Sequence, residues 1–185
     1  MTVVDWRAGL DTQTEQNLVE AARSGCVESL GRLYERYYTS MVWVAYAILL
    51  DRDLAEDTAQ EAFARACARL ADLRHTDRFG TWLGRICRNE AHQVLRGRRR
   101  QEAAKVPIEE EVSPTVGSDG YDQAVKEAVD QLPLPYREVV VLHYYNDMGY
   151  EQMHQVLGIS VDCVKGRLSR ARKRIGTALR RRGFD

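Results

Sequence analysis

The sequence predicts an all-α protein of two small helical domains joined by a flexible acidic linker. Apolar residues recur at helical rather than alternating spacing, and the first hundred residues contain no proline. Proline, glycine and acidic residues then gather in residues 101–121, where the apolar periodicity is weak. Four short helical segments follow, separated by prolines and glycines. We therefore expect domains at residues 14–100 and 122–182, with the linker between them.

The composition excludes several classes of protein. Hydrophobic residues make up 44% of the 185 residues, which allows a core in each domain and excludes a wholly disordered chain. No apolar run reaches the length of a membrane span and no secretory signal is visible, so we expect a cytoplasmic protein without membrane insertion. The four cysteines lie far apart, with no histidine at ligand spacing, which predicts reduced, mostly buried thiols and no metal site. No phosphate-binding glycine loop or nucleophile motif occurs, so we expect no cofactor and no enzymatic activity.

Residues 53–72, placed on a helix, divide into an apolar face and an acidic face. The apolar face consists of Ala59, Phe63, Ala66 and Leu70. The opposite side, here called the acidic face, consists of Asp53, Asp57, Gln60 and Glu61. From the pattern alone an ordinary solvated surface is the favoured interpretation, because acidic residues near a helix start are also stabilised by the helix dipole.

Residues 80–100 form a second two-sided helix, with an apolar face that contains Trp82, Leu83, Ile86, Cys87 and Val94. The other side carries cationic residues at spacings of three, four, four and three, here called the basic row: Arg85, Arg88, His92, Arg96 and Arg99. Like charges stacked in this way repel by about a few tenths of a kcal/mol per pair, and a polyanion would relieve the repulsion. Phe79 and Trp82 could stack on an unpaired base, although core packing is the competing interpretation and is favoured for Trp82.

The C-terminal segment has the layout of a helix-turn-helix motif. Gly158 separates residues 150–157 from a helix that begins after Ser160, a favourable N-cap residue. In the second helix an apolar seam leaves Asp162, Gly166, Ser169, Arg170 and Lys173 outward, with Lys165 at the flank. The net charge of the chain is zero, but Val164 to Phe184 contains nine basic residues and no acidic one. This distribution predicts a recognition helix that binds DNA.

Four stretches of the sequence, two in each predicted domain, resemble the extracytoplasmic-function group of sigma factors, the promoter-recognition subunits of bacterial RNA polymerase. DLAEDTAQEAF at residues 53–63 and FGTWLGRICRN at residues 79–89 are similar to the second domain of that family. LPLPYREVVVL at residues 132–142 and YEQMHQVLGISVDCVKGRLSRAR at residues 150–172 are similar to its fourth domain. Together the two matches cover roughly residues 17–100 and 121–179, in the family's order, and this is more specific than either match alone.

The resemblance implies a protein that binds core RNA polymerase and directs promoter recognition, promoter melting and transcription initiation. It implies that the acidic face meets the clamp helices of the largest polymerase subunit and that the fourth domain meets the flap. It implies that the segment 79–99 opens the minus-ten element, with Asn89 close to a flipped base. The positions that the resemblance implies at the minus-35 element are Lys165, Gly166, Ser169 and Arg170. We expect Asp162, Arg167 and Lys173 to complete the same DNA-binding surface. A helical anti-sigma protein is a further expected partner, and the free chain is expected to be a monomer.

Four positions depart from the family pattern and leave the promoter preference open. Gln93 stands where many members have Asp, Cys163 where Thr is usual, and Gly166 where Ser is usual. His154 stands where a small Ala normally lets the two helices of the motif pack closely. Local repacking is one alternative there, and we expect the larger side chain to be tolerated at the edge of the motif. The alternative function is a stand-alone helix-turn-helix regulator that binds duplex DNA, but it would leave the acidic face and the basic row unexplained.

Overall fold

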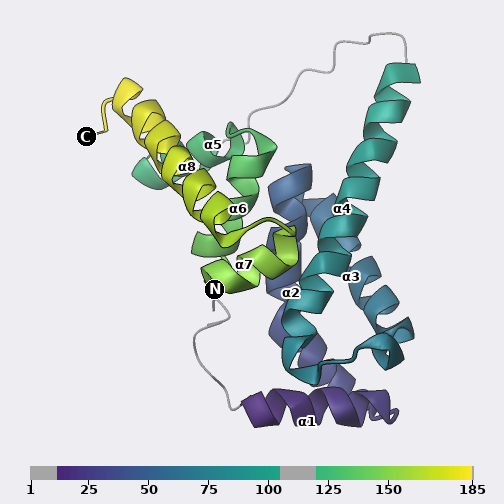
Figure 1. Ribbon diagram of the computed structural model, residues 1–185. Helices are drawn as coiled ribbons and strands as arrows, with labels where there is room; N and C mark the ends of the chain where they lie inside the picture. Colours follow the sequence, from purple (N-terminus) through teal and green to yellow (C-terminus); the bar gives the residue numbers. More distant parts are fainter. Residues whose placement is uncertain (1–11, 105–119, 185) are drawn as a thin grey trace.

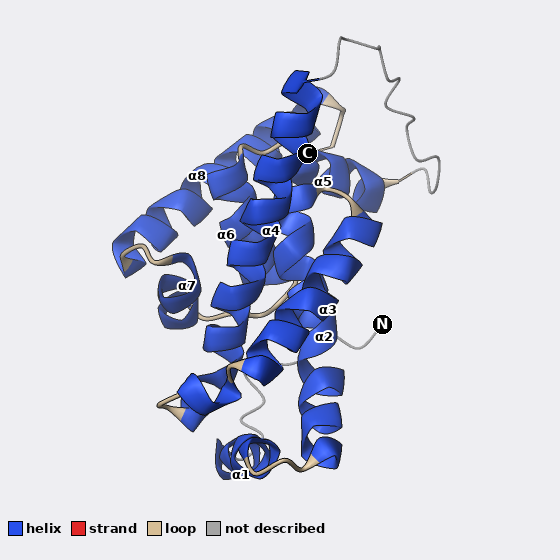
Figure 2. Cartoon of the chain, turned by 90° about the vertical axis from the view of Figure 1, so that its right-hand side faces the viewer, coloured by secondary structure: helices blue, strands red, loops and turns tan. Residues whose placement is uncertain are grey.

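The computed structural model describes residues 12–104 and 120–184, and these residues fold entirely into helices and connecting turns (Figures 1 and 2). The N-terminal part contains α1 (Thr12–Arg23), α2 (Val27–Leu49), α3 (Arg52–Ala68), the short 3-10 helices η1 (Leu70–Asp72) and η2 (Thr76–Arg78), and α4 (Phe79–Ala104). The C-terminal part contains α5 (Tyr121–Asp130), α6 (Leu134–Tyr144), α7 (Tyr150–Leu157) and α8 (Val161–Arg181). The predicted all-α class is confirmed. Most of the predicted linker, residues 105–119, lies outside the described residues.

Helices α2, α3 and α4 form the core of the N-terminal domain. Leu50 adopts a left-handed conformation with φ 54°, which ends α2, and Asp51 then caps α3 by accepting a hydrogen bond from the Leu54 N–H at 3.1 Å. Helix α3 ends at Ala68, earlier than the segment 53–72 predicts, and Leu70 reaches the core from η1. Helices α2, α3 and α4 each supply buried side chains to this core, among them Leu33, Met41, Phe63, Leu83 and Cys87.

The C-terminal domain contains the predicted helix-turn-helix arrangement. Gly158 has φ 69°, a left-handed conformation that glycine adopts without steric cost, and it ends α7. The Ser160 hydroxyl accepts a hydrogen bond from the Cys163 N–H at 3.2 Å and caps α8. Along α8 the predicted apolar seam is buried at Val164, Leu168, Ala171 and Leu179 and half-buried at Ile175. The seam packs against α5, α6 and α7, which leaves the opposite face of α8 toward solvent.

The two domains pack directly against each other, an interface that the sequence did not indicate. Helix α6 contacts α2, and α7 contacts α4 (Figure 1). The buried side chains of both domains belong to one continuous core. The Trp43 and Tyr145 rings lie 4.7 Å apart across the interface. The Arg137 Nε–H donates to the Ala47 carbonyl at 2.6 Å.

The expectation of mostly buried thiols is wrong. Cys26, Cys67 and Cys163 are exposed and only Cys87 is buried, where desolvation raises the pKa of its thiol. Periodicity places a residue on a helix face but does not show whether another element covers that face.

In the part of the chain that the structure describes, no group of His, Cys, Asp and Glu side chains is arranged to hold a metal ion. None of the described helices combines the length and the apolar character needed to cross a bilayer.

Candidate nucleic-acid interface

The acidic face predicted on α3 is fully presented to solvent. All four of its side chains are exposed, because the alternate positions Ala55, Ala59, Ala62 and Phe63 pack into the core. Glu61 pairs with Arg65 one turn later at 2.8 Å, whereas Asp53 and Asp57 form no ion pair among the described residues. The face is therefore an accessible anionic surface suited to a cationic protein partner.

The basic row on α4 is divided by the packing of the two domains. Arg85, Arg96 and Arg99 are exposed, as predicted. Arg88 and His92, in the middle of the row, are half-buried against Glu138 of α6. The Arg88 Nε–H donates to the Glu138 carboxylate at 2.7 Å, and the His92 Nε2 lies 3.6 Å from the same oxygen. In this arrangement only part of the predicted row is free surface.

Glu138 is a buried acid that stays charged because of its two partners. Its side chain is only 6% exposed. Burial by itself would raise the pKa of the Glu138 carboxyl, but the contacts from His92 and Arg88 outweigh burial and lower that pKa below its ordinary value. No local sequence signal marks Glu138, since its partners lie on another helix about fifty residues away.

The two aromatic residues at the start of α4 differ in how deeply they are buried. Phe79 is 1% exposed and packs with its ring 5.5 Å from that of Tyr37, so it is a core residue and not a surface for a base. Trp82, for which core packing was the favoured interpretation, does pack against the core, but it is only half-buried and also borders the surface. The difference arises because Phe79 lies on the side of α4 that packs against α2, where its ring meets Tyr37.

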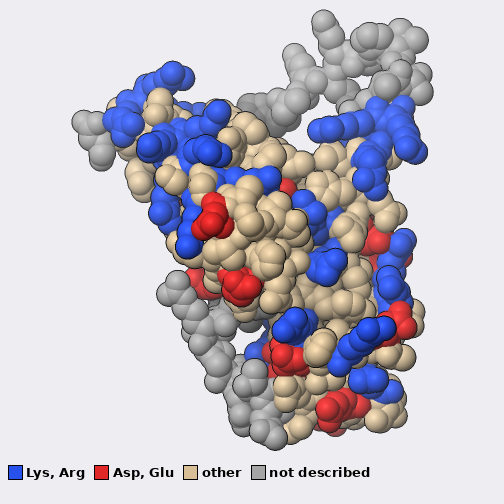
Figure 3. All heavy atoms as spheres, in the orientation of Figure 1, with Lys and Arg blue, Asp and Glu red and all other residues tan. Residues whose placement is uncertain are grey.

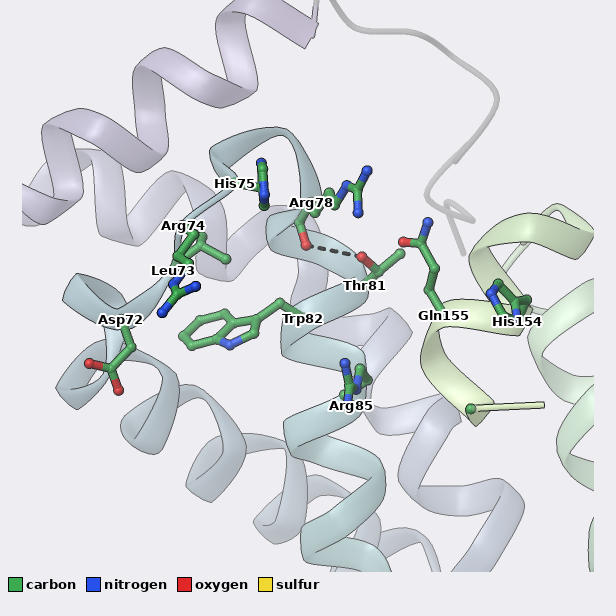
Figure 4. A pocket seen from close by; sticks show the side chains of 11 residues that line it. Asp72, Leu73, Arg74, His75, Arg78, Thr81, Trp82, Arg85, His154 and Gln155 are labelled. Carbon is green, nitrogen blue, oxygen red and sulfur yellow. Dashed lines mark hydrogen bonds between the residues drawn. The ribbon is translucent and has the colours of Figure 1, made fainter. Parts of the chain in front are cut away.

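Trp82 borders a cavity of about 450 Å³ between the segment 72–85 and α7 (Figure 4). Three guanidinium groups line the cavity beside the indole ring, those of Arg74, Arg78 and Arg85. The Thr81 hydroxyl donates to the Arg78 carbonyl at 3.0 Å and ties the start of α4 to the preceding turn. Sequence reasoning missed Arg74 and Arg78, although the density of cationic side chains from residue 74 to residue 78 was a usable signal.

Asn89 lies on a different side of α4 from Arg88 and His92. It is exposed and lines a groove between α3 and α4 together with Gln93, Arg65 and Arg69. Arg65 bridges the two helices, because it pairs with both Glu61 and Glu90 at 2.8 Å. The structure therefore brings Asn89 close to α3 rather than to the middle of the basic row.

The predicted reading face of α8 is largely free. Asp162, Lys165, Ser169, Arg170 and Lys173 are exposed, while Gly166 and Arg167 are half-buried. Figure 3 shows Lys and Arg side chains gathered over α8 and, separately, over the C-terminal end of α4. These two cationic surfaces are the ones that the charge pattern predicted.

His154, the most unusual residue of the motif, fits without disturbing it. Its ring is half-buried at the turn, with Nδ1 2.6 Å from the Ile159 carbonyl oxygen, so the Nδ1–H donates across the turn from α7 to the segment before α8. Its neighbours Met153, Val156 and Leu157 are buried. The side chain is thus accommodated at the turn by a hydrogen bond that joins α7 to the segment before α8.

Comparisons with known proteins agree with this geometry. The family model "Sigma-70 region 2" matches residues 33–101, and the model "Sigma-70, region 4" matches residues 122–175. The chain is 30% identical to RNA polymerase sigma-H factor of Pseudomonas aeruginosa, over 92% of this chain and 96% of that protein. It is 35% identical to the probable RNA polymerase sigma factor RfaY of Xanthomonas campestris pv. campestris, over 95% of this chain, but it spans only 46% of that relative's length.

Two solved structures are similar to this chain over most of their length. CnrH in complex with the cytosolic domain of CnrY matches with a TM-score of 0.68 and 27% identity, over 89% of this chain and 96% of CnrH. RpoE in complex with the anti-sigma factor NepR from Bartonella quintana matches with a TM-score of 0.67 and 26% identity, over 81% of this chain and 96% of RpoE. A stand-alone regulator is not favoured, because both sigma regions match in order. The chain belongs to the sigma-70 family of RNA polymerase sigma factors, in its extracytoplasmic-function group, whose members are transcription initiation factors.

Proposed function

We propose that three surfaces divide the work of initiation. The acidic face of α3 binds the clamp helices of the largest polymerase subunit, the α4 surface binds and opens the minus-ten element, and α8 reads the minus-35 element while its domain contacts the flap. One observation carries the proposal: three separate exposed surfaces have the sign of charge that suits these partners, anionic on α3 and cationic on α4 and α8. Residues 14–100 and 122–182 act as the two working domains, with residues 101–121 as the spacer.

On α4, exposed cations and one aromatic ring would hold a separated strand. Arg85, Arg96 and Arg99 are free to contact phosphates. Trp82 offers an indole face with the Arg74 guanidinium beside it, the chemistry that binds an unpaired base, and Arg78 lines the same cavity farther from the ring (Figure 4). Stacking of a base on an aromatic ring contributes about 1–3 kcal/mol, enough to offset much of the few kcal/mol that unpairing costs. Asn89, at the groove beside α3, would accept a base on the other side of the helix.

On α8, the outward residues near the N-terminal end would meet base edges in the major groove. Lys165 and Arg170 are long exposed donors, and Ser169 lies between them on the same face. Asp162, Gly166, Arg167 and Lys173 complete the surface, with Lys173 toward the phosphates. Arg172 is held by the Tyr144 hydroxyl at 2.7 Å and is therefore fixed for a backbone contact. A helical anti-sigma protein is proposed as a further partner, since the solved relatives include complexes with anti-sigma factors.

The acidic face can be tested with a charge reversal that leaves the core intact. Asp57→Lys combined with Glu61→Lys should lower the affinity for core polymerase, because both carboxylates are exposed and would meet a cationic partner. Glu20→Lys combined with Glu35→Lys, on exposed positions of α1 and α2, is the charge-matched control and should bind as the wild type does. Fluorescence anisotropy of the labelled chain, titrated with core polymerase, measures the affinity of each double variant. Equal affinity in the two double variants contradicts the assignment.

A further inference from the structure

An exposed cluster of two tyrosines and an arginine lies where α6, α7 and α8 meet. Tyr144 is the last residue of α6 and Tyr150 is the first residue of α7, and their side chains are 51% and 37% exposed. The Arg172 Nε–H on α8 donates to the Tyr144 hydroxyl at 2.7 Å, and the guanidinium carbon lies 5.8 Å from the centre of the Tyr144 ring. Large aromatic side chains that stay exposed beside a DNA-reading helix mark a candidate contact surface.

The connection between α6 and α7 holds the two tyrosines in place. The His143 ring lies close to both, with centroid distances of 4.8 Å to Tyr144 and 5.6 Å to Tyr150. The His143 Nδ1–H donates to the Met148 carbonyl at 3.1 Å, and the Met148 N–H donates to the Leu142 carbonyl at 3.0 Å. The cluster is therefore ordered before any ligand binds, which lowers the entropy that binding would cost.

The cluster offers hydrogen-bond donors to solvent. Because the Tyr144 oxygen accepts from Arg172, its own O–H is available to donate elsewhere. Hydrogen bonding by Tyr144, and to a smaller extent by Tyr150, stabilises the charged guanidinium and raises the pKa of Arg172. In the part of the chain that the structure describes, no acidic side chain pairs with Arg172. Hydroxyl and guanidinium donors without an acidic partner suit a phosphate group.

The position of the cluster favours a DNA phosphate over a carboxylate of a partner protein. Arg172 follows Lys165 by about two helical turns, so the two cations lie on the same edge of α8. Ser169, on the reading face, lies about one turn before Arg172. A helix in the major groove brings its edges toward the sugar-phosphate backbones, and the preceding helix of the motif crosses a backbone. Tyr150 begins that preceding helix.

We propose that Tyr144, Tyr150 and Arg172 form a phosphate-binding site that holds one strand of DNA at the edge of the minus-35 major groove. The inference rests on the minus-35 role proposed above for α8. The Tyr144 O–H and the Arg172 Nη–H groups donate to the oxygens of one phosphodiester group, and the Tyr150 O–H donates beside them. The contact carries no sequence information, but it fixes the register of α8 in the groove.

Removal of one hydroxyl group tests the site in the holoenzyme, with a promoter fragment that the holoenzyme selects from genomic DNA. Tyr144→Phe keeps the ring beside Arg172 but removes the donor, and it should weaken promoter binding about tenfold, the usual effect of losing a hydrogen bond to a charged group. The salt dependence of binding should stay unchanged, because tyrosine is neutral, whereas Arg172→Ala should reduce its slope by about one. Tyr136→Phe is the matched control and should bind as the wild type does, since the Tyr136 ring also contacts an arginine of α8, Arg174, at 5.2 Å.

Uncharged phosphates locate the contact on the DNA. Methylphosphonate groups replace single phosphates along both strands of the minus-35 element, and the affinities of the wild type and of Tyr144→Phe are measured for each duplex. At the contacted phosphate the two affinities should converge, because the hydroxyl has lost its charged acceptor, and elsewhere the tenfold difference should persist. A difference that persists at every phosphate position overturns the site.

The outcomes separate this site from the proposed function. If scrambling the minus-35 element leaves the affinity of the wild type unchanged, the minus-35 role of α8 is wrong and the phosphate site is wrong with it. If the wild type discriminates against the scrambled element but Tyr144→Phe binds as tightly as Tyr136→Phe, only the phosphate site is wrong. Weaker binding of Tyr144→Phe to core polymerase in the absence of DNA would assign the cluster to a protein partner instead.

Discussion

Phe79 and Trp82 show how burial decides the role of a single residue. The two aromatics lie three positions apart at the start of α4, and both fit the local apolar pattern. Only Phe79 lies beneath neighbouring helices, at 1% exposure, while Trp82 borders the cationic cavity. Sequence periodicity could not separate them, because the distinction depends on how α2 packs against α4.

The two aromatics should therefore respond differently to truncation. Phe79→Ala should lower the free energy of unfolding by about 3–5 kcal/mol, the usual cost of removing a buried aromatic side chain. Trp82→Ala should cost clearly less in stability but should reduce promoter opening, because it removes the proposed stacking surface. Guanidinium denaturation measures the first effect and permanganate reactivity of unpaired thymines measures the second. A stable Phe79→Ala variant with impaired opening contradicts the assignment.

Glu138 is the residue whose importance depends most on tertiary structure. Its lowered pKa means that the folded chain gains stability from the charged carboxylate at pH values above the ordinary glutamate pKa, and that this gain is lost as the pH falls through the lowered value. The groups that face it are Arg88 and His92 of α4, with Arg137 next to it on α6.

The pH dependence can be measured as a difference between two proteins. The free energy of unfolding of the wild type should exceed that of Glu138→Gln near neutral pH, and the two values should converge as the pH is lowered below the ordinary glutamate range. Urea denaturation at a series of pH values gives both curves. A constant difference over the whole acidic range contradicts a charged Glu138 in the folded state.

At the scale of the element, the faces of α3 and α8 were predictable because both follow from spacing along one helix. The acidic face is exposed and the apolar seam of α8 is buried at the predicted positions. Gly158 and Ser160 mark the turn and the cap that the sequence indicated, since each acts through its own backbone conformation or side chain. Helix α4 is different, because the exposure of Arg88 and His92 in its basic row depends on α6, a helix that is distant in sequence.

Removing one positive charge from α4 and removing one from α8 should change transcription initiation in different ways. If Lys165 reads a base, Lys165→Ala should cost about 1–3 kcal/mol in discrimination between promoters. The difference in initiation between a cognate promoter and one with a scrambled minus-35 element should therefore become smaller. Arg99→Ala should weaken initiation on both templates and reduce the salt slope by about one, because its proposed contact is to a phosphate. In vitro transcription at several salt concentrations compares them. If Arg99→Ala abolishes discrimination while Lys165→Ala leaves it intact, the placement of the recognition helix is wrong.

At the scale of the whole molecule, the order of the two sigma regions was readable from the sequence, but their packing was not. Hydrophobic periodicity reports that Trp43 and Tyr145 have an apolar environment, and it carries no information about which helix provides it. The same holds for Arg137, whose guanidinium donates to the backbone carbonyl of Ala47 in the other domain. A contact between residues about ninety positions apart is set by the assembled fold.

The central claim is that this chain acts as the promoter-recognition subunit of RNA polymerase. Core polymerase that is free of any other sigma factor, mixed with this chain and genomic DNA fragments, tests it most directly, with sequencing of the 5′ ends of the transcripts. The account predicts transcripts that start at defined sites, share upstream elements and disappear when the chain is omitted. Binding of the chain alone to duplex DNA, with no transcript unless another sigma factor is added, would contradict the account and favour a stand-alone regulator.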